Sequence, residues 1–193
     1  NWFTNYIAKW CIEYALENIN TVKTDHISDY IRIKEKVNFS DDELSKWKNV
    51  ADNMYFPFSE KHNVFLQQDG FLDKELISVA DLNKSQRPIN QKWSWDRILR
   101  SPYIKQADTL QGFYMFEEDF SKEELERHFD FYEPFTVHES SLSPCLHSIQ
   151  AAKLGRMDQA YEFYLRTSRL DLDDYNHEVE EGLHITSMAG TWM

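Results

Sequence analysis

The sequence has no long hydrophobic run, no cluster of basic residues and only two cysteines among its 193 residues. No apolar stretch approaches the roughly 18 residues that a membrane-spanning helix needs, and no signal peptide is visible. Lys and Arg number 21 against 33 Asp and Glu, so the formal net charge of −12 would repel a nucleic-acid backbone. We therefore expect a cytoplasmic protein that has neither nucleic acid nor a membrane as its partner.

Metal-binding patterns are also missing. The seven His residues show no pair at the spacing of zinc ligands on a helix. An acidic run between residues 171 and 181 lacks the alternating ligands and the central Gly of a calcium-binding EF-hand loop. Cys11 and Cys145 lie in apolar, helix-like contexts, which favours two buried free thiols, although a single disulfide stays open. We expect no metal and no cofactor.

Helical periodicity runs through almost the whole chain. Residues 2–19 are apolar on two faces, which predicts a helix buried on more than one side, as inner helices of a layered barrel are. A more amphipathic helix begins at Asp41. Residues 63–68 read as a short strand, with Asp69-Gly70 as its turn, and an extended excursion follows over 71–92. Further helices are expected at 93–100, 106–116, 122–131, 144–154, 158–169 and 183–193.

The later helices begin in ways that suit an anion. Ser143 followed by Pro144 predicts a helix start with Ser at the N-cap, and His138, Glu139, Ser140 and Ser141 come just before it. Gly155 fits the end of that helix, and Asp158 fits the N-cap of the next. Gly182 and His184 precede another start of this kind. Unpaired N–H groups at a helix start bind anions such as phosphate, although the same groups can serve only to cap the helix.

At these residues the chain resembles the family of disaccharide phosphorylases acting on α-glucosides, glycoside hydrolase family 65, which includes maltose, trehalose, kojibiose and nigerose phosphorylases. The resemblance runs from end to end and is most specific in five blocks. They are 97–108 (RILRSPYIKQAD), 129–134 (FDFYEP), 136–143 (TVHESSLS), 166–174 (RTSRLDLDD) and 182–190 (GLHITSMAG).

The resemblance implies an all-α fold that is part of an (α/α)6 barrel, with a few short strands in an excursion near residues 60–90. Residues 1–193 would be the C-terminal portion of the catalytic barrel, without the N-terminal β-sandwich, the first part of the barrel and the C-terminal sheet domain. The family's general-acid Glu would lie just upstream of Asn1, so no catalytic acid is expected within the chain. The remainder of the same polypeptide and a second copy, forming a homodimer, are the expected protein partners.

The implied reaction is inverting phosphorolysis of an α-linked glucose disaccharide, with maltose and inorganic phosphate giving β-glucose 1-phosphate and glucose. Phosphate is a co-substrate and needs no activating base, whereas an inverting hydrolase uses a second carboxylate and a water. Lys105 and Gln106 match the family's positions for the glucosyl residue of the donor. Ser140, Ser141, Gly182 and His184 match those for phosphate. The order His-Glu-Ser-Ser is similar to maltose-type members, so Glu139 is expected to point away from phosphate or to pair with a neighbour.

Three alternatives remain. A hydrolase of the same fold would use Glu139 to activate water, and the disaccharide could instead be trehalose, kojibiose or nigerose. A helical-repeat interaction module would explain the similarity of residues 155–169 to one tetratricopeptide helix, but no 34-residue self-similarity recurs along the chain.

Overall fold

The computed structural model describes residues 1–140, 142–174 and 179–193, apart from the side chain of Glu181. The chain forms two compact units, Asn1–Pro57 and Phe58–Met193. Within the described residues, helices dominate and the only sheet has two strands, as the all-α prediction requires. None of the described helices has the length and hydropathy needed to cross a membrane.

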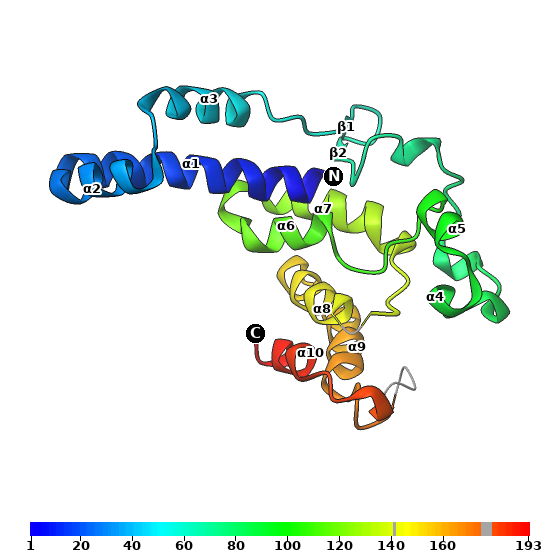
Figure 1. Ribbon diagram of the computed structural model, residues 1–193. Helices are drawn as coiled ribbons and strands as arrows, with labels where there is room; N and C mark the ends of the chain where they lie inside the picture. The colour runs from blue at the N-terminus through cyan, green and yellow to red at the C-terminus, as the bar shows by residue number, and fades with distance from the viewer. Residues whose placement is uncertain (141, 175–178) are drawn as a thin grey trace. The chain divides into compact units, whose positions relative to one another are not determined.

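The first unit is built from three helices, α1 (Trp2–Asp25), α2 (Ile27–Val37) and α3 (Asp41–Asp52). The predicted helix at 2–19 is therefore longer than expected, and α3 begins at Asp41 as predicted. Ser40 and Glu43 form a capping box that starts α3, and α3 runs back beside α1 (Figure 1).

The expected burial of α1 on several sides is wrong for this structure. Only Trp2 is buried, where its ring packs against Tyr6 and Phe56. The remaining apolar positions stay partly open because α2 and α3 cover only part of the helix. Cys11, which was predicted to be buried, is exposed, and Cys145 is half-buried; both are free thiols.

An irregular excursion opens the second unit. Strand β1 (Phe58–Ser59) pairs antiparallel with β2 (Val64–Phe65), so the hairpin turn precedes the predicted strand instead of following it. Gly70 has a φ of 71° and leads into a 3-10 turn, η1 (Phe71–Asp73), because glycine tolerates this backbone. The excursion continues through η2 (Val79–Asp81), η3 (Lys84–Gln86), α4 (Ile89–Lys92) and α5 (Trp95–Arg100).

The remaining helices form the body of the second unit. They are α6 (Thr109–Met115), η4 (Glu117–Asp119), α7 (Lys122–Tyr132), η5 (Glu133–Phe135), α8 (Ser143–Leu154), α9 (Met157–Ser168), η6 (Val179–Glu181), α10 (Ile185–Ala189) and η7 (Gly190–Trp192). Helices α8 and α9 pack side by side (Figure 1). Gly155 ends α8 with a φ of 81°, as predicted. Arg156, not Asp158, is the N-cap of α9, because the helix begins one residue earlier than the sequence suggests.

Two buried polar side chains of α7 form hydrogen bonds with the backbone of the excursion. The Nε2 atom of His128 accepts a hydrogen bond from the Phe65 N–H at 2.8 Å. The Tyr132 hydroxyl accepts from the Gln67 N–H and donates to the Phe65 carbonyl, both at 2.7 Å. Both side chains are almost fully buried in the core of the unit. These bonds satisfy backbone groups that a two-residue strand leaves unpaired.

Candidate functional site

The predicted binding residues lie in three segments, each directly before a helix. Lys105 and Gln106 precede α6 and are exposed. Ser140 precedes α8 and is half-buried. Gly182 is exposed and His184 is half-buried, both ahead of α10. Ser141, the sixth predicted residue, lies outside the described residues. All three segments therefore lead into helices of the second unit.

The first two segments run side by side. Ile104 and Thr136 form an isolated parallel bridge, in which the Ile104 N–H donates to the Phe135 carbonyl at 2.9 Å and the Val137 N–H donates to the Ile104 carbonyl at 3.0 Å. In a parallel pair both chains leave in the same direction. The bridge therefore sends Lys105-Gln106 and the loop that begins at His138 toward the same end of the unit.

Two arginines contact described residues of the segment between His138 and Leu142, here called the 138–142 loop. The Arg166 guanidinium, in the last turn of α9, donates to the His138 carbonyl. Arg87 pairs with the Glu139 carboxylate at 2.9 Å, and that carboxylate also accepts the Ile89 N–H at 2.7 Å. The Glu139 side chain is 8% exposed. The expectation that Glu139 pairs with a neighbour is thus confirmed.

Ser143 does not cap α8, contrary to the prediction. Leu142 is the N-cap and Ser143 is the first helical residue. Its buried hydroxyl lies 3.3 Å from Nδ1 of His138 instead. The hydroxyl is engaged by the loop because His138 turns back over the helix start with a φ of 51°.

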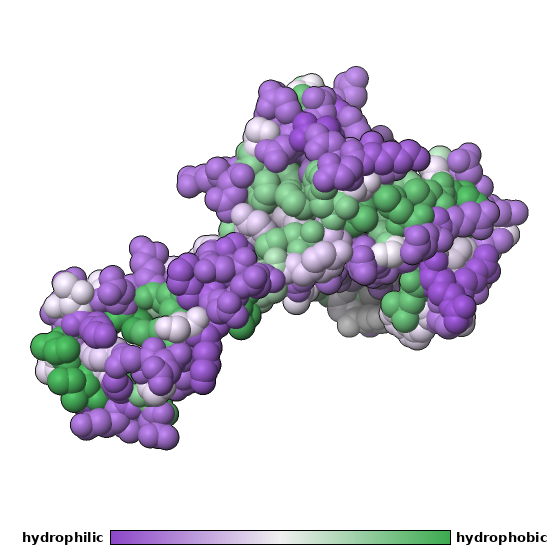
Figure 2. All heavy atoms as spheres, turned by 90° about the horizontal axis from the view of Figure 1, so that it is seen from above, coloured by the Kyte–Doolittle hydropathy of each residue, from purple (hydrophilic) through white to green (hydrophobic). Residues whose placement is uncertain are grey.

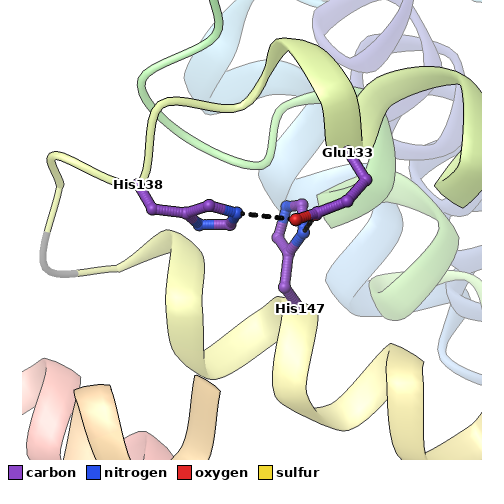
Figure 3. Close-up of side chains that lie close together, drawn as sticks. All are labelled: Glu133, His138 and His147. Atoms are coloured by element: carbon purple, nitrogen blue, oxygen red, sulfur yellow. Dashed lines mark hydrogen bonds and ion pairs between the residues drawn. The ribbon is translucent and has the colours of Figure 1, made fainter. Parts of the chain in front are cut away.

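His138 belongs to a buried cluster with Glu133 and His147 (Figure 3). One Glu133 oxygen lies 3.2 Å from Nε2 of His138, and the other contacts Nδ1 of His147. Burial raises the pKa of Glu133, but hydrogen bonds from the two rings outweigh it and bring the pKa to about 2. Burial lowers the pKa of His138. The three ligand atoms lie within 4.8 Å of one another, close enough to consider a metal ion.

The third segment is organised by Asp171. Its carboxylate accepts the His184 backbone N–H at 2.6 Å and lies 2.7 Å from Nδ1 of the same residue. Burial raises the pKa of Asp171, yet these two hydrogen bonds keep it below its ordinary value. Helix α10 spans only five residues, so its dipole adds little. The predicted phosphate-binding role of this segment would therefore depend on the His184 ring.

Sequence reasoning missed the residues that orient the site. Asp171 lies in the acidic run at 171–181 and Glu133 lies in the block 129–134, and the sequence gave neither residue a role. Arg87 and Arg166 were likewise not singled out. Their partners lie 5 to 52 residues away in sequence, at separations that match no helical or strand repeat, so local spacing gave no signal.

The second segment, which carries Ser140, and the third, which carries His184, are both held by residues near the end of α9. Arg166 lies in its last turn and holds the 138–142 loop, and Asp171 follows the helix and holds His184. Near the other end of α10, a Cβ on Gly190 would come within 2.5 Å of the Cys145 sulfur, so a larger residue there would displace the Cys145 side chain on α8. These contacts link α8, α9 and α10 around the two loops.

All 193 residues match the model of the glycosyl hydrolase family 65 central catalytic domain. The chain is 50% identical over its full length to the maltose phosphorylase of Bacillus subtilis and 43% identical to the trehalose phosphorylase of Thermoanaerobacter brockii, in each case over 25% of the relative. A solved structure assigned as a kojibiose phosphorylase from the human microbiome superposes on the whole chain with a TM-score of 0.88 at 38% identity, over 26% of that chain.

The chain thus spans about a quarter of the length of the curated relatives that it matches. Its helices have the architecture of a part of an (α/α)6 barrel. Family model, relatives and solved structure agree along the whole sequence: the chain belongs to the central catalytic domain family of glycosyl hydrolase family 65.

Proposed function

We propose that the full-length protein containing this chain phosphorolyses maltose with inversion, giving β-glucose 1-phosphate and glucose. Relatives at 50%, 43% and 37% identity are maltose, trehalose and kojibiose phosphorylases, respectively. Disaccharide phosphorolysis is common to these names, and the higher identity to the maltose enzyme favours maltose.

The observation that carries the proposal is the arrangement of the loops. The parallel bridge at Ile104 and Thr136 sends Lys105-Gln106 and the 138–142 loop the same way. Arg166 and Asp171 fasten that loop and His184 near the end of one helix. Phosphorolysis requires a site for a sugar beside a site for an anion. The residue pair Lys105-Gln106 would supply the first, and the two loops that carry Ser140 and His184 would supply the second.

Each group has a role in the proposed reaction. Lys105 and Gln106 bind the glucosyl unit. Ser140, Ser141, Gly182 and His184 hold phosphate, whose oxygen attacks the anomeric carbon as the glycosidic bond breaks on the opposite face. The departing glucose takes its proton from a general acid. We propose that this acid lies outside the 193 residues, in the remainder of the same polypeptide, and that the chain forms the later part of its catalytic barrel.

The state of the two carboxylates near the 138–142 loop argues against hydrolysis. A hydrolase needs a carboxylate that can take a proton from water. Glu139 is occupied by Arg87 and the Ile89 N–H. Glu133 is occupied by two imidazoles, and its pKa of about 2 makes it a weak base. Phosphate, which is already an anionic nucleophile, needs neither group.

The test is product analysis with the purified full-length protein. Maltose is incubated with and without inorganic phosphate, and glucose 1-phosphate and its anomer are assigned by NMR. We expect the β anomer to appear only with phosphate, in equal amount to glucose. Release of two glucose molecules without phosphate would instead indicate a hydrolase. Parallel reactions with trehalose, kojibiose and nigerose test the assignment of maltose, which fails if another disaccharide reacts with a higher kcat/KM.

A further inference from the structure

We propose that Glu133 is a positioning residue that holds residues 138–140 in the conformation that binds phosphate. The inference rests on the proposed function, because it concerns the loop that carries Ser140. Glu133 itself lies in η5, ahead of the loop, and is not assigned to contact phosphate.

Glu133 ties the loop to the helix that follows it. Its Oε1 atom lies 3.2 Å from Nε2 of His138 in the loop. Its Oε2 atom contacts Nδ1 of His147, one turn into α8 and fully buried. The two rings, drawn in Figure 3, meet edge to face with centroids 4.6 Å apart. Both also pack on Phe163 of α9. One carboxylate therefore joins η5, the loop and α8.

The hydrogen-bond partners fix where the protons lie. An ionised Glu133 can only accept, so Nε2 of His138 and Nδ1 of His147 must each carry a proton. Nδ1 of a neutral His138 then accepts from the Ser143 hydroxyl, 3.3 Å away. Nε2 of His147 is buried and has no partner among the described residues, so it is better placed as a bare acceptor than as an N–H. Two neutral rings around one carboxylate satisfy this arrangement.

A metal ion would fit the same cluster less well. It would have a single carboxylate to offset its charge, while the Arg166 guanidinium already donates to the His138 carbonyl. Coordination through Nδ1 of His147 would also move the ring proton to the buried Nε2, which lacks a partner. Burying excess positive charge and an unpaired N–H is unfavourable. The cluster is therefore assigned to hydrogen bonding.

The loop needs such an anchor because of its backbone. His138 has a φ of 51°, a left-handed conformation that side-chain-bearing residues adopt only when their surroundings hold them. This turn sets the direction of the next two residues, so that Glu139 reaches Arg87 and Ser140 follows. Without Glu133, the His138 ring loses the partner that opposes this strain, and only Arg166 and Arg87 still restrain the backbone that leads to Ser140.

The experiment compares Glu133→Gln with Ala151→Gly in the full-length protein. Ala151 is fully buried in α8 but has no side-chain hydrogen bond, so Ala151→Gly destabilises the same helix without touching the cluster. We expect Glu133→Gln to raise the KM for phosphate about tenfold, as the loss of a charge-assisted hydrogen bond would, with little change in the KM for maltose. Ala151→Gly should lower the melting temperature while leaving both KM values unchanged.

A second readout does not depend on turnover. Inorganic phosphate should raise the melting temperature of the wild type and of Ala151→Gly, and this increment should shrink in Glu133→Gln because weaker binding stabilises less. His138→Asn, which tolerates the left-handed backbone but breaks the link to Glu133, should behave in the same way. It replaces Glu133→Gln if that variant does not fold.

The outcomes separate the inference from the proposed function. Equal phosphate increments and equal KM values in Glu133→Gln and the wild type would overturn the positioning role. A stoichiometric metal ion in the wild type, measured by elemental analysis and lost in Glu133→Gln, would overturn it as well. A protein that binds phosphate but forms no glucose 1-phosphate would contradict the proposed function while leaving the positioning role supported by the melting increments.

Discussion

At the scale of single residues, His184 is oriented by one carboxylate that accepts twice. Asp171 takes both the backbone N–H and the ring Nδ1 of His184, so the ring's Nε2 lies on the side opposite Asp171. An imidazole fixed at Nδ1 presents Nε2 in a defined direction, which is what an anion site requires. The assignment of phosphate to His184 therefore makes Asp171 part of the same unit.

This coupling predicts the behaviour of a double mutant of the full-length protein. His184→Ala and Asp171→Asn should each raise the KM for phosphate by about ten- to hundredfold, the effect of one charge-assisted hydrogen bond, with little change for maltose. The double variant should be little worse than His184→Ala, because Asp171 affects phosphate mainly by orienting the ring and its remaining bond to the backbone N–H at position 184 does not. Asp173→Asn is the matched control, since Asp173 pairs with Arg169 on the surface. Fully additive effects of the two substitutions would contradict the coupling.

At the scale of elements, α7 is joined to β2 through His128, whose two ring nitrogens both have hydrogen-bond partners when the ring is neutral. Nε2 of His128 accepts from the Phe65 N–H, and Nδ1 lies 2.7 Å from the Glu124 carbonyl. Burial lowers the pKa of His128 to about 4, although the Glu124 carbonyl opposes this. In the unfolded segment, His128 gains a proton below pH 6.5, whereas in the folded segment it gains that proton only near pH 4. Stability is thus lost as the pH falls through that window.

The expected result is acid-induced local opening. Between pH 6.5 and pH 5 the contact between α7 and β2 should lose up to about 2 kcal/mol. Hydrogen exchange of peptides covering 58–67 and 122–132, corrected for the intrinsic pH dependence of exchange, measures this loss. His128→Gln can still accept from Phe65 but does not titrate, so it should flatten the pH dependence. His62→Gln, in the same excursion, should leave it intact. An equal pH slope in His128→Gln would exclude His128 as the cause.

Helices were more predictable than the connections between them. Apolar periodicity located α3 and α6 to α9 to within a few residues, because each buries one stripe against its neighbours. It gave no indication of the pairing of β1 with β2, which is completed by His128 and Tyr132 from α7. Similarly, the blocks singled out loops that precede helices, but they gave no sign of the contacts of Glu133 or Asp171, which depend on how the fold turns these side chains toward their partners.

At the scale of the whole molecule, the chain leaves large apolar side chains open to solvent. Trp10 and Tyr14 stack with centroids 5.1 Å apart on α1 and are 45% and 54% exposed. On α2, Ile27, Ile31 and Val37 are also exposed. Hydrophobic atoms, green in Figure 2, reach the surface in patches among hydrophilic ones. Patches of this kind mark surfaces that other protein normally covers, which agrees with a chain that spans a quarter of its relatives.

The 193 residues expressed alone should therefore self-associate. Burying each large apolar side chain is worth about 1.5–3 kcal/mol, so several exposed together favour aggregation or a non-native assembly over a dispersed monomer. Size-exclusion chromatography with light scattering should show oligomers of the isolated chain, whereas the full-length protein should give one defined species. Trp10→Gln combined with Tyr14→Gln should reduce the self-association of the isolated chain, while Glu13→Gln, on the same helix but with a polar side chain, should not. If the isolated chain is a monodisperse monomer that unfolds cooperatively, these apolar surfaces do not need a partner, and the view that the rest of the barrel covers them is wrong.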